Sequence, residues 1–123
     1  MAKRGTIQET SILLKTINNA ILDKQGEQLL NLDLTKIENA VAKHFVICHA
    51  NSSTQVNAIA NNIEAMVKNN LDERAWKKEG YSNSEWILLD YANVVVHVFQ
   101  TQAREFYKLE KLWADAETIL IND

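Results

Sequence analysis

Two apolar runs separated by a two-residue break constrain this chain more than any other stretch. The runs cover residues 86–91 and 94–99, and the break between them is Ala92–Asn93. The second run contains four valines, whose β-branched side chains fit a pleated surface, so both runs are predicted to be strands. Asn93 tolerates a positive φ, which a tight turn requires, and the stretch is therefore predicted to form a β-hairpin.

The turn fixes which side chains share a face of this hairpin. With Ala92–Asn93 as the turn, Tyr91 faces Val94 and Trp86 faces Phe99. Side chains alternate across a strand, so one face is apolar and is predicted to be core. That face carries Ile87, Leu89, Tyr91, Val94, Val96 and Val98.

The opposite face of the hairpin has a mixed composition. It carries Trp86, Leu88, Asp90, Val95, His97 and Phe99. Two large aromatic side chains beside an acid and an imidazole are too apolar for open solvent and too polar for an ordinary core. Aromatic anchors next to specific polar groups are typical of protein interfaces, so this face is predicted to be a recognition surface.

Periodic apolar patterns predict the other elements. Three-to-four spacing predicts a helix over residues 9–24, and a second helix follows Ser52, which stands three residues before Gln55 as in a capping box. Strands are predicted at 30–34 with one buried face, at 44–50, and around 75–77. Residues 1–8 and 117–123 are expected to be loose ends.

A last helix is predicted after the hairpin. Thr101 is expected to cap it, and charged residues such as Arg104, Lys108 and Lys111 are expected on its solvated face. Its predicted apolar stripe consists of Phe106, Leu109, Leu112, Trp113 and Ala116.

The order of these elements predicts one α/β domain over residues 1–123. It runs helix, strand, strand, helix, strand, strand, strand, helix, which gives a mixed β-sheet of about five strands flanked by helices. The helix between the second and third strands permits a parallel crossover. A chain of 123 residues is long enough to bury a core of this kind.

Composition narrows the possible partners. The chain is 46% hydrophobic and 24% charged, as in soluble globular proteins, and its net charge is −3. That charge argues against non-specific binding to nucleic acid or to a membrane surface, but it leaves open a protein partner within a nucleoprotein particle. The single cysteine, Cys48, permits no internal disulfide, and a cytoplasmic location is expected.

Two groups of residues invite a catalytic or metal-binding interpretation. His44, Cys48 and His49 are ligand types, but on one strand the first two share a face and the third points away, so no metal or other cofactor is expected. Asp90 and His97 are diagonal neighbours that could act as an acid–imidazole couple. Their face supplies no nucleophile, so we favour a pair that satisfies polar atoms at an interface, and no catalytic residue is expected.

The hairpin and the residues after it resemble a known family. The run WILLDYANVVVHVF, followed by AREFYKLEKLW, is similar to the ribosomal silencing factors, the RsfS or Iojap-like proteins. The resemblance extends over roughly residues 12–113. The chain departs from the family pattern at three places: Lys43 replaces the usual Asp before the FVI-like strand, His49–Ala50 replaces Thr-Gly or a similar pair, and Ala92–Asn93 replaces Gly-Asp.

The resemblance implies a non-enzymatic regulator of translation with a nucleotidyltransferase-like fold that lacks the catalytic carboxylates. Proteins of this family bind large-subunit ribosomal protein fourteen on the subunit-joining face of the large ribosomal subunit. They thereby block association with the small subunit when nutrients are short, and they often form homodimers when free. The alternative is a nucleotidyltransferase-like or hydrolytic enzyme that uses Asp90 and His97.

The residues expected to contact such a partner follow from this resemblance and from the mixed hairpin face. Asp90 is expected to pair with a lysine or arginine, and Trp86 and Phe99 are expected to fill apolar pockets. No membrane contact and no direct sequence-specific contact with nucleic acid is expected. The full expected set is Trp86, Leu88, Asp90, Tyr91, Val95, His97 and Phe99.

Overall fold

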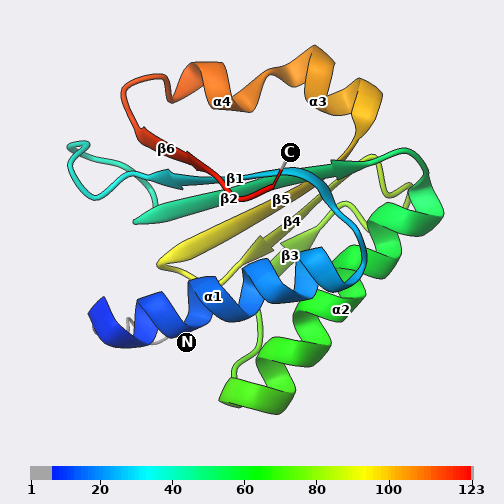
Figure 1. The fold of residues 1–123 in the computed structure, drawn as a ribbon, viewed down its shortest axis with the longest axis horizontal. Coiled ribbons are helices and arrows are strands. Elements are labelled where there is room, and N and C mark those ends of the chain that lie inside the picture. The colour runs from blue at the N-terminus through cyan, green and yellow to red at the C-terminus, as the bar shows by residue number, and fades with distance from the viewer. Residues whose placement is uncertain (1–6, 123) are drawn as a thin grey trace.

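A mixed sheet lies between two covering layers in the computed structural model of the chain, which describes residues 7–122 (Figure 1). Helices α1 (Ile7–Asp23) and α2 (Ser53–Leu71) pack on one face of the sheet. The other face is covered by the loop 34–43 and by a C-terminal segment that contains two short helices, α3 (Thr101–Tyr107) and α4 (Leu109–Leu112). The predicted single α/β domain is confirmed.

The sheet has six strands rather than the predicted five. They are β1 (Glu27–Asp33), β2 (His44–Ala50), β3 (Lys77–Glu79), β4 (Trp86–Asp90), β5 (Val94–Gln100) and β6 (Glu117–Leu120). Their order across the sheet is β3-β4-β5-β2-β1-β6. β2 and β5 are parallel, and the other neighbouring strands are antiparallel. The predicted helix, α2, follows β2 and permits this parallel arrangement, although the strand that pairs with β2 is β5 rather than β3.

The sixth strand arises where a loose end was expected. Glu117–Leu120 pairs with β1 in antiparallel register from Leu30↔Leu120 to Asp33↔Glu117. Asn122, just after this strand, is also bound to the sheet. Its side-chain amide accepts from Leu29 N at 2.8 Å and donates to the carbonyl of Gly26, in the turn before β1. The expected N-terminal loose end is also shorter, since α1 begins at Ile7; residues 1–6 and 123 lie outside the described part.

The hairpin has the predicted register, with Trp86 opposite Phe99. Its turn differs in one respect, because Ala92 rather than Asn93 takes the positive φ, at 73°. The Asn93 N–H donates to the carbonyl of Tyr91 at 3.0 Å, which closes a γ-turn around Ala92. The carboxylate of Asp90 supports this turn by accepting the Ala92 N–H at 2.7 Å.

Side chains on the two faces of the sheet form two separate cores. The predicted core face of the hairpin is confirmed: its six residues are all at most 4% exposed and pack with α1 and α2. The second core lies beneath the C-terminal segment and the loop 34–43, and includes Phe45, Phe99 and Leu109. β1 therefore has two buried faces instead of the predicted one, since Leu29 enters the first core and Leu32 the second.

The predicted caps of two helices and the predicted start of one strand are confirmed only in part. Ser52 caps α2 by accepting the Gln55 N–H at 3.1 Å, as predicted. Thr101 does not cap α3, because Gln100 occupies the N-cap position without a side-chain hydrogen bond. β3 begins at Lys77, two residues later than predicted.

Among the described helices, none is long and apolar enough to cross a membrane.

The predicted last helix is broken at Lys108. This residue has a left-handed φ of 48°, so α3 ends there and α4 starts in a new direction. The break removes the predicted apolar stripe, because Phe106 and Leu112 are 78% and 75% exposed while Leu109 is buried.

Replacing Ala92 by glycine is expected to stabilise the protein. A positive φ costs an L-residue about 1–2 kcal/mol, whereas glycine costs about 0.4–1 kcal/mol in unfolded-chain entropy. The free energy of unfolding of Ala92→Gly should therefore rise by about 0.5–1 kcal/mol in urea denaturation. Ala65→Gly, in the exposed middle of α2, is the matched control and should lose about 1 kcal/mol. A loss of stability in Ala92→Gly would contradict this account of the turn.

Candidate protein-docking surface

The structure leaves three of the seven expected contact residues accessible. Trp86, Leu88 and Asp90 are half-buried on β4. The other four are at most 7% exposed; they are Tyr91, Val95, His97 and Phe99. Three of these lie beneath the C-terminal layer, whereas Tyr91 faces the opposite layer and packs in the first core. The exposed part of the expected set therefore lies on β4.

Trp86 is held in a fixed orientation at the border of the second core. Its indole stacks on Phe99 with ring centroids 4.8 Å apart and contacts Tyr107 at the same centroid distance. Its Nε1–H donates to Nδ1 of His97 at 3.1 Å. A half-exposed aromatic side chain with such contacts is already ordered before a partner arrives, which lowers the entropic cost of binding.

Aromatic side chains of α3 continue this surface. Tyr107 is 49% exposed, and its ring contacts Phe106 edge-on with centroids 5.0 Å apart. We call the four residues Trp86, Leu88, Phe106 and Tyr107 the aromatic ridge. Phe106 was predicted to lie in the buried apolar stripe of the last helix, because that helix was expected to be unbroken. Adjacent aromatics such as Phe106 and Tyr107 cannot both point into one core from a helix, and this was the available signal for an exposed ring.

A hollow of about 310 Å³ beside the ridge is lined by Glu79, Gly80, Trp86 and Leu88. Gly80 has a φ of 94°, and a Cβ at this position would overlap the carbonyl of Trp86, so only glycine allows the β3–β4 connection to approach so closely. Glu79 provides an acid at the hollow and pairs with Lys77 at 3.4 Å. The hollow thus combines apolar walls with an acid, which suits the stem and cationic head of a basic side chain.

Asp90 and His97 do not form the acid–imidazole couple considered above. The carboxylate of Asp90 accepts the backbone N–H of Ala92, and Nδ1 of His97 accepts from Trp86. Within residues 7–122 no hydrogen bond or ion pair joins the two side chains. Their geometry therefore supports structural roles, in the hairpin turn and in holding the indole.

The three metal-ligand types on β2 are also separated. Cys48 is fully buried in the first core, where burial raises the pKa of its thiol to about 12. His44 lies near the start of the strand beside the loop 34–43, and His49 points to the opposite face from Cys48. Across the described residues, no group of three or more His, Cys, Asp and Glu side chains is arranged to hold a metal ion.

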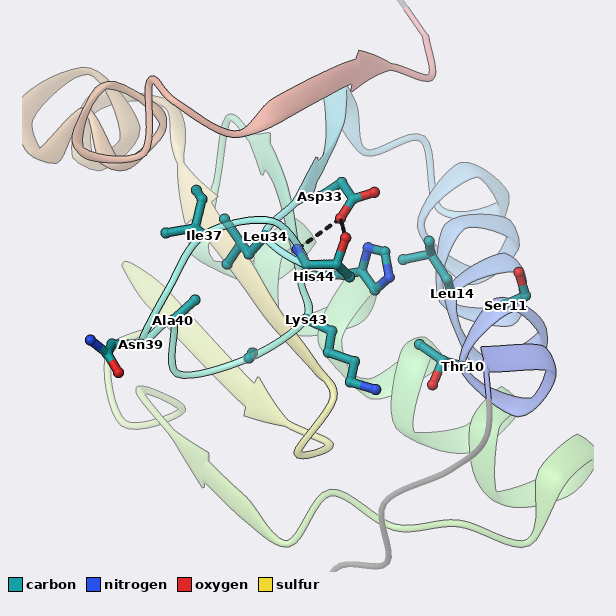
Figure 2. Close-up of a pocket in the computed structure, with 12 residues that line it drawn as sticks. Thr10, Ser11, Leu14, Asp33, Leu34, Ile37, Asn39, Ala40, Lys43 and His44 are labelled. Carbon is teal, nitrogen blue, oxygen red and sulfur yellow. Dashed lines mark hydrogen bonds between the residues drawn. The ribbon is translucent and has the colours of Figure 1, made fainter.

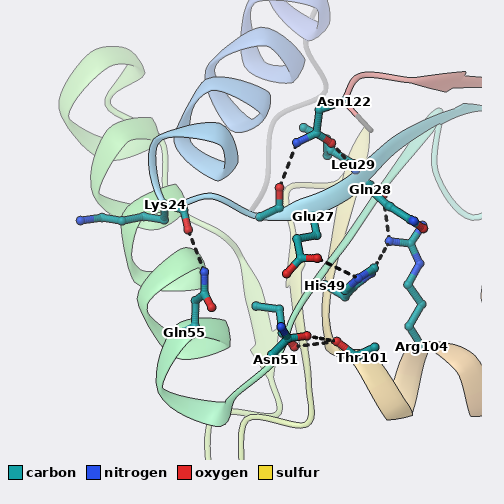
Figure 3. A network of polar contacts seen from close by, with 12 residues as sticks. Lys24, Glu27, Gln28, Leu29, His49, Asn51, Gln55, Thr101, Arg104 and Asn122 are labelled. Atoms are coloured by element: carbon teal, nitrogen blue, oxygen red, sulfur yellow. Dashed lines mark hydrogen bonds and ion pairs between the residues drawn. The ribbon is translucent and has the colours of Figure 1, made fainter.

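Arg104 connects the C-terminal segment to the sheet, contrary to the prediction that it lies on a solvated face (Figure 3). It is only 6% exposed. Its Nη1 donates to the Gln28 carbonyl at 2.8 Å and contacts Nδ1 of His49 at 2.9 Å, while Nε donates to Glu110 at 3.1 Å. One guanidinium thus joins β1, β2, α3 and α4, and it fixes the helix that carries Phe106.

His49 accepts this hydrogen bond in its neutral form. Burial, and secondarily the charge of Arg104, lowers the pKa of His49, so Nδ1 is free to accept and Nε2 carries the proton. Nε2 lies 3.9 Å from a carboxylate oxygen of Glu27, a contact that is an ion pair only when the imidazole is protonated. Arg104 is therefore the charged cation of this hydrogen-bond network, and His49 takes part as a neutral acceptor.

Removing the Arg104 side chain is expected to destabilise the fold. Arg104→Ala leaves the Glu110 carboxylate without its cation and the Gln28 carbonyl without its donor. Loss of one partner from a mostly buried pair costs about 3 kcal/mol in the free energy of unfolding, measurable by chemical denaturation. Arg74→Ala, at an exposed arginine, should change stability by less than about 0.5 kcal/mol. Equal effects in both variants would show that the buried network contributes nothing.

His97 makes stability depend on pH. Burial lowers the pKa of His97 to about 4, because removal from water disfavours the charged form of the ring. Above about pH 6.5 the ring is neutral in both the folded and the unfolded chain. Between pH 6.5 and 4 only the unfolded chain takes up this proton, so acidification favours unfolding by about 3 kcal/mol from His97 alone.

The test compares unfolding at pH 7 and pH 4. In His97→Gln the loss of stability on acidification should be smaller by about 3 kcal/mol than in the wild type, because the titrating ring is gone. His44 and His49 remain in both proteins, so their contributions cancel. An NMR titration that gives His97 a pKa near 6.5 would contradict the buried neutral ring.

Comparison with known proteins places this arrangement in a family. The family model for "Ribosomal silencing factor during starvation" (RsfS) matches residues 7–123. The chain is 44% identical over 104 residues to the ribosomal silencing factor RsfS of Bacillus subtilis, covering 85% of this chain and 86% of the relative. It is 42% identical over 107 residues to the RsfS of Halalkalibacterium halodurans, covering 87% and 90%.

A solved structure shows the same fold. The crystal structure of a Bacillus halodurans protein superposes with a TM-score of 0.78 at 37% sequence identity, and the match covers 90% of this chain and 99% of that one. The family model, the curated relatives and the solved structure each match most of the chain, and the residues matched by the family model include the aromatic ridge. The chain belongs to the ribosomal silencing factor family.

Proposed function

We propose that this protein docks on the large ribosomal subunit through the aromatic ridge and blocks association with the small subunit. The observation that carries the proposal is the exposure of Phe106 and Tyr107, at 78% and 49%, in contact with a half-exposed Trp86 that is already fixed in place. Exposed aromatic side chains grouped beside acidic residues have the composition of an interface hot spot.

Charge favours a basic protein over RNA as the surface that the ridge contacts. The net charge is −3, and Glu79 and Asp90 lie on the same sheet face as Trp86 and Leu88. Phosphate groups would be repelled by these acids, whereas a lysine or arginine of a ribosomal protein would pair with them. The resemblance names large-subunit ribosomal protein fourteen as this partner, on the subunit-joining face.

The proposed action is steric and needs no chemistry from this chain. A domain bound at the subunit-joining face occupies space that the small subunit requires, and translation is repressed while nutrients are limiting. The separate hydrogen-bond partners of Asp90 and His97 support a non-enzymatic role over the enzyme alternative. The nucleotidyltransferase-like label for the fold, the cytoplasmic location and a homodimer of the free protein remain part of this proposal.

Phe106→Ala is the sharpest test of the docking surface. Phe106 contributes little to the fold because it is mostly exposed, but as an interface anchor its loss should cost about 2–4 kcal/mol, or roughly 30- to 1,000-fold in affinity. Co-sedimentation with purified large subunits should fall accordingly while the free energy of unfolding changes by less than about 0.5 kcal/mol.

Controls separate docking from folding and from self-association. Val41→Ala removes an equally exposed apolar side chain, 74% exposed, from the loop 34–43 and should bind as the wild type does. Asp90→Asn tests the charge while keeping an acceptor for Ala92. Light scattering of each variant without ribosomes reports on the homodimer. Unchanged co-sedimentation of Phe106→Ala would remove the ridge from the docking surface.

A further inference from the structure

A second hollow lies between α1 and the loop 34–43, and the docking surface does not include it (Figure 2). Its volume is about 630 Å³, which falls within the range of about 300–1,000 Å³ that is typical of small-molecule sites. Figure 2 shows Thr10 and Leu14 of α1 on one side and Leu34 and Ile37 of the loop on the other, with Lys43 between them.

The loop that forms one wall is tied in place by its own hydrogen bonds. Leu34 N donates to the Lys43 carbonyl at 2.8 Å, and Ile37 N donates to the Leu34 carbonyl at 3.0 Å. The backbone N–H groups of Lys43 and His44 both donate to the Asn93 carbonyl at 3.0 Å. The hollow is thus a preformed feature, since its wall is anchored both to itself and to the hairpin turn.

The lining combines apolar and polar groups. Leu14 and Ile37, both half-buried, provide apolar surface from two sides, whereas Leu34 is only 1% exposed. The carboxylate of Asp33 is already engaged, because it accepts from Thr35 N at 2.9 Å and from the Thr35 hydroxyl at 2.6 Å. These hydrogen bonds lower the pKa of Asp33, so the carboxylate is charged at neutral pH.

Lys43 is the cation of this hollow. It is half-buried, and in the described part of the chain no acid lies within ion-pair distance of its ammonium group. Neighbouring His44 is kept neutral, because burial lowers the pKa of its imidazole, and a neutral ring offers both a donor and an acceptor. Among the described residues Lys43 thus has no ion-pair partner, whereas the acid of the lining, Asp33, is already bound by Thr35. Such a cation beside a neutral imidazole and apolar walls favours an anion attached to an apolar body.

We propose that this hollow binds a small organic anion, with its carboxylate or phosphate group on Lys43 and its flat apolar body against Leu14 and Ile37. The site is independent of the docking surface, since Lys43 and the ridge residues lie on different elements. It therefore stands or falls separately from the proposed function.

The test uses 1-naphthyl phosphate, which carries both groups, and follows backbone amide shifts of the ¹⁵N-labelled full chain. Saturable shifts are expected at residues of the loop 34–43 and of the first turns of α1, with none at Trp86 or Tyr107. 1-Naphthol and inorganic phosphate, which each carry only one of the groups, should bind at least about tenfold more weakly, since each loses one set of contacts.

Charge variants complete the experiment. Lys43→Gln and Lys43→Glu should each weaken 1-naphthyl phosphate binding by about tenfold or more, whereas Lys24→Glu, an equal charge change at an exposed position of the α1–β1 turn, should not. The Gln variant keeps a polar side chain of similar length, and its amide spectrum reports whether the fold is intact. Absent or unsaturable shifts, shifts centred on the ridge, equal binding of 1-naphthol, or unchanged affinity in both Lys43 variants would overturn the proposal.

Discussion

The parallel pairing of β2 with β5 imposes the constraint on which the rest of the structure depends. These two strands lie at the centre of the sheet and carry apolar side chains on both faces, so the fold must supply a covering layer on each side. Two regular helices provide one layer. The other layer consists of the loop 34–43 and the segment after residue 100. It packs on the sheet in the second core, which contains Phe45, Phe99 and Leu109.

This second layer stops short of β4, and the candidate docking surface lies at that border. Trp86 is part of both the second core and the docking surface. Its indole contacts buried Phe99, and it also contacts exposed Tyr107 and lines the hollow near Gly80. The contacts that complete the core therefore also order the anchor for recognition. Arg104 contributes from a distance, since it fixes α3 to two strands and thereby holds the exposed rings.

Alternation and spacing within the sequence were sufficient for the local elements. The hairpin register, its core face and the Ser52 cap depend on residues that are close in sequence, and all three are as predicted. One group of errors concerns contacts between residues that are distant in sequence. Arg104 bonds to Gln28, 76 positions away, and no pattern around Arg104 indicates that a strand bulge will present a carbonyl to it.

Two changes of chain direction could not be predicted from the sequence either, because neither contains a glycine or a proline. Lys108 takes a left-handed conformation that breaks the last helix, and this break both exposes Phe106 and allows residues 117–120 to return as a strand. Ala92 takes a positive φ that its side chain disfavours, held there by the Asp90 carboxylate. In both cases the local hydrogen bonds are satisfied in a conformation that the residue itself disfavours, because Ala92 N–H donates to Asp90 and Lys108 N–H donates to the Arg104 carbonyl.

The proposal that the ridge keeps ribosomal subunits apart is tested most directly by sedimentation. Purified large subunits are mixed with this protein, small subunits are added, and the mixture is separated on a sucrose gradient. The account predicts that the protein travels with free large subunits, is absent from joined ribosomes, and reduces the amount of joined ribosomes as its concentration rises. Protein that sediments with joined ribosomes, or joining that proceeds unchanged at saturating protein, would contradict it.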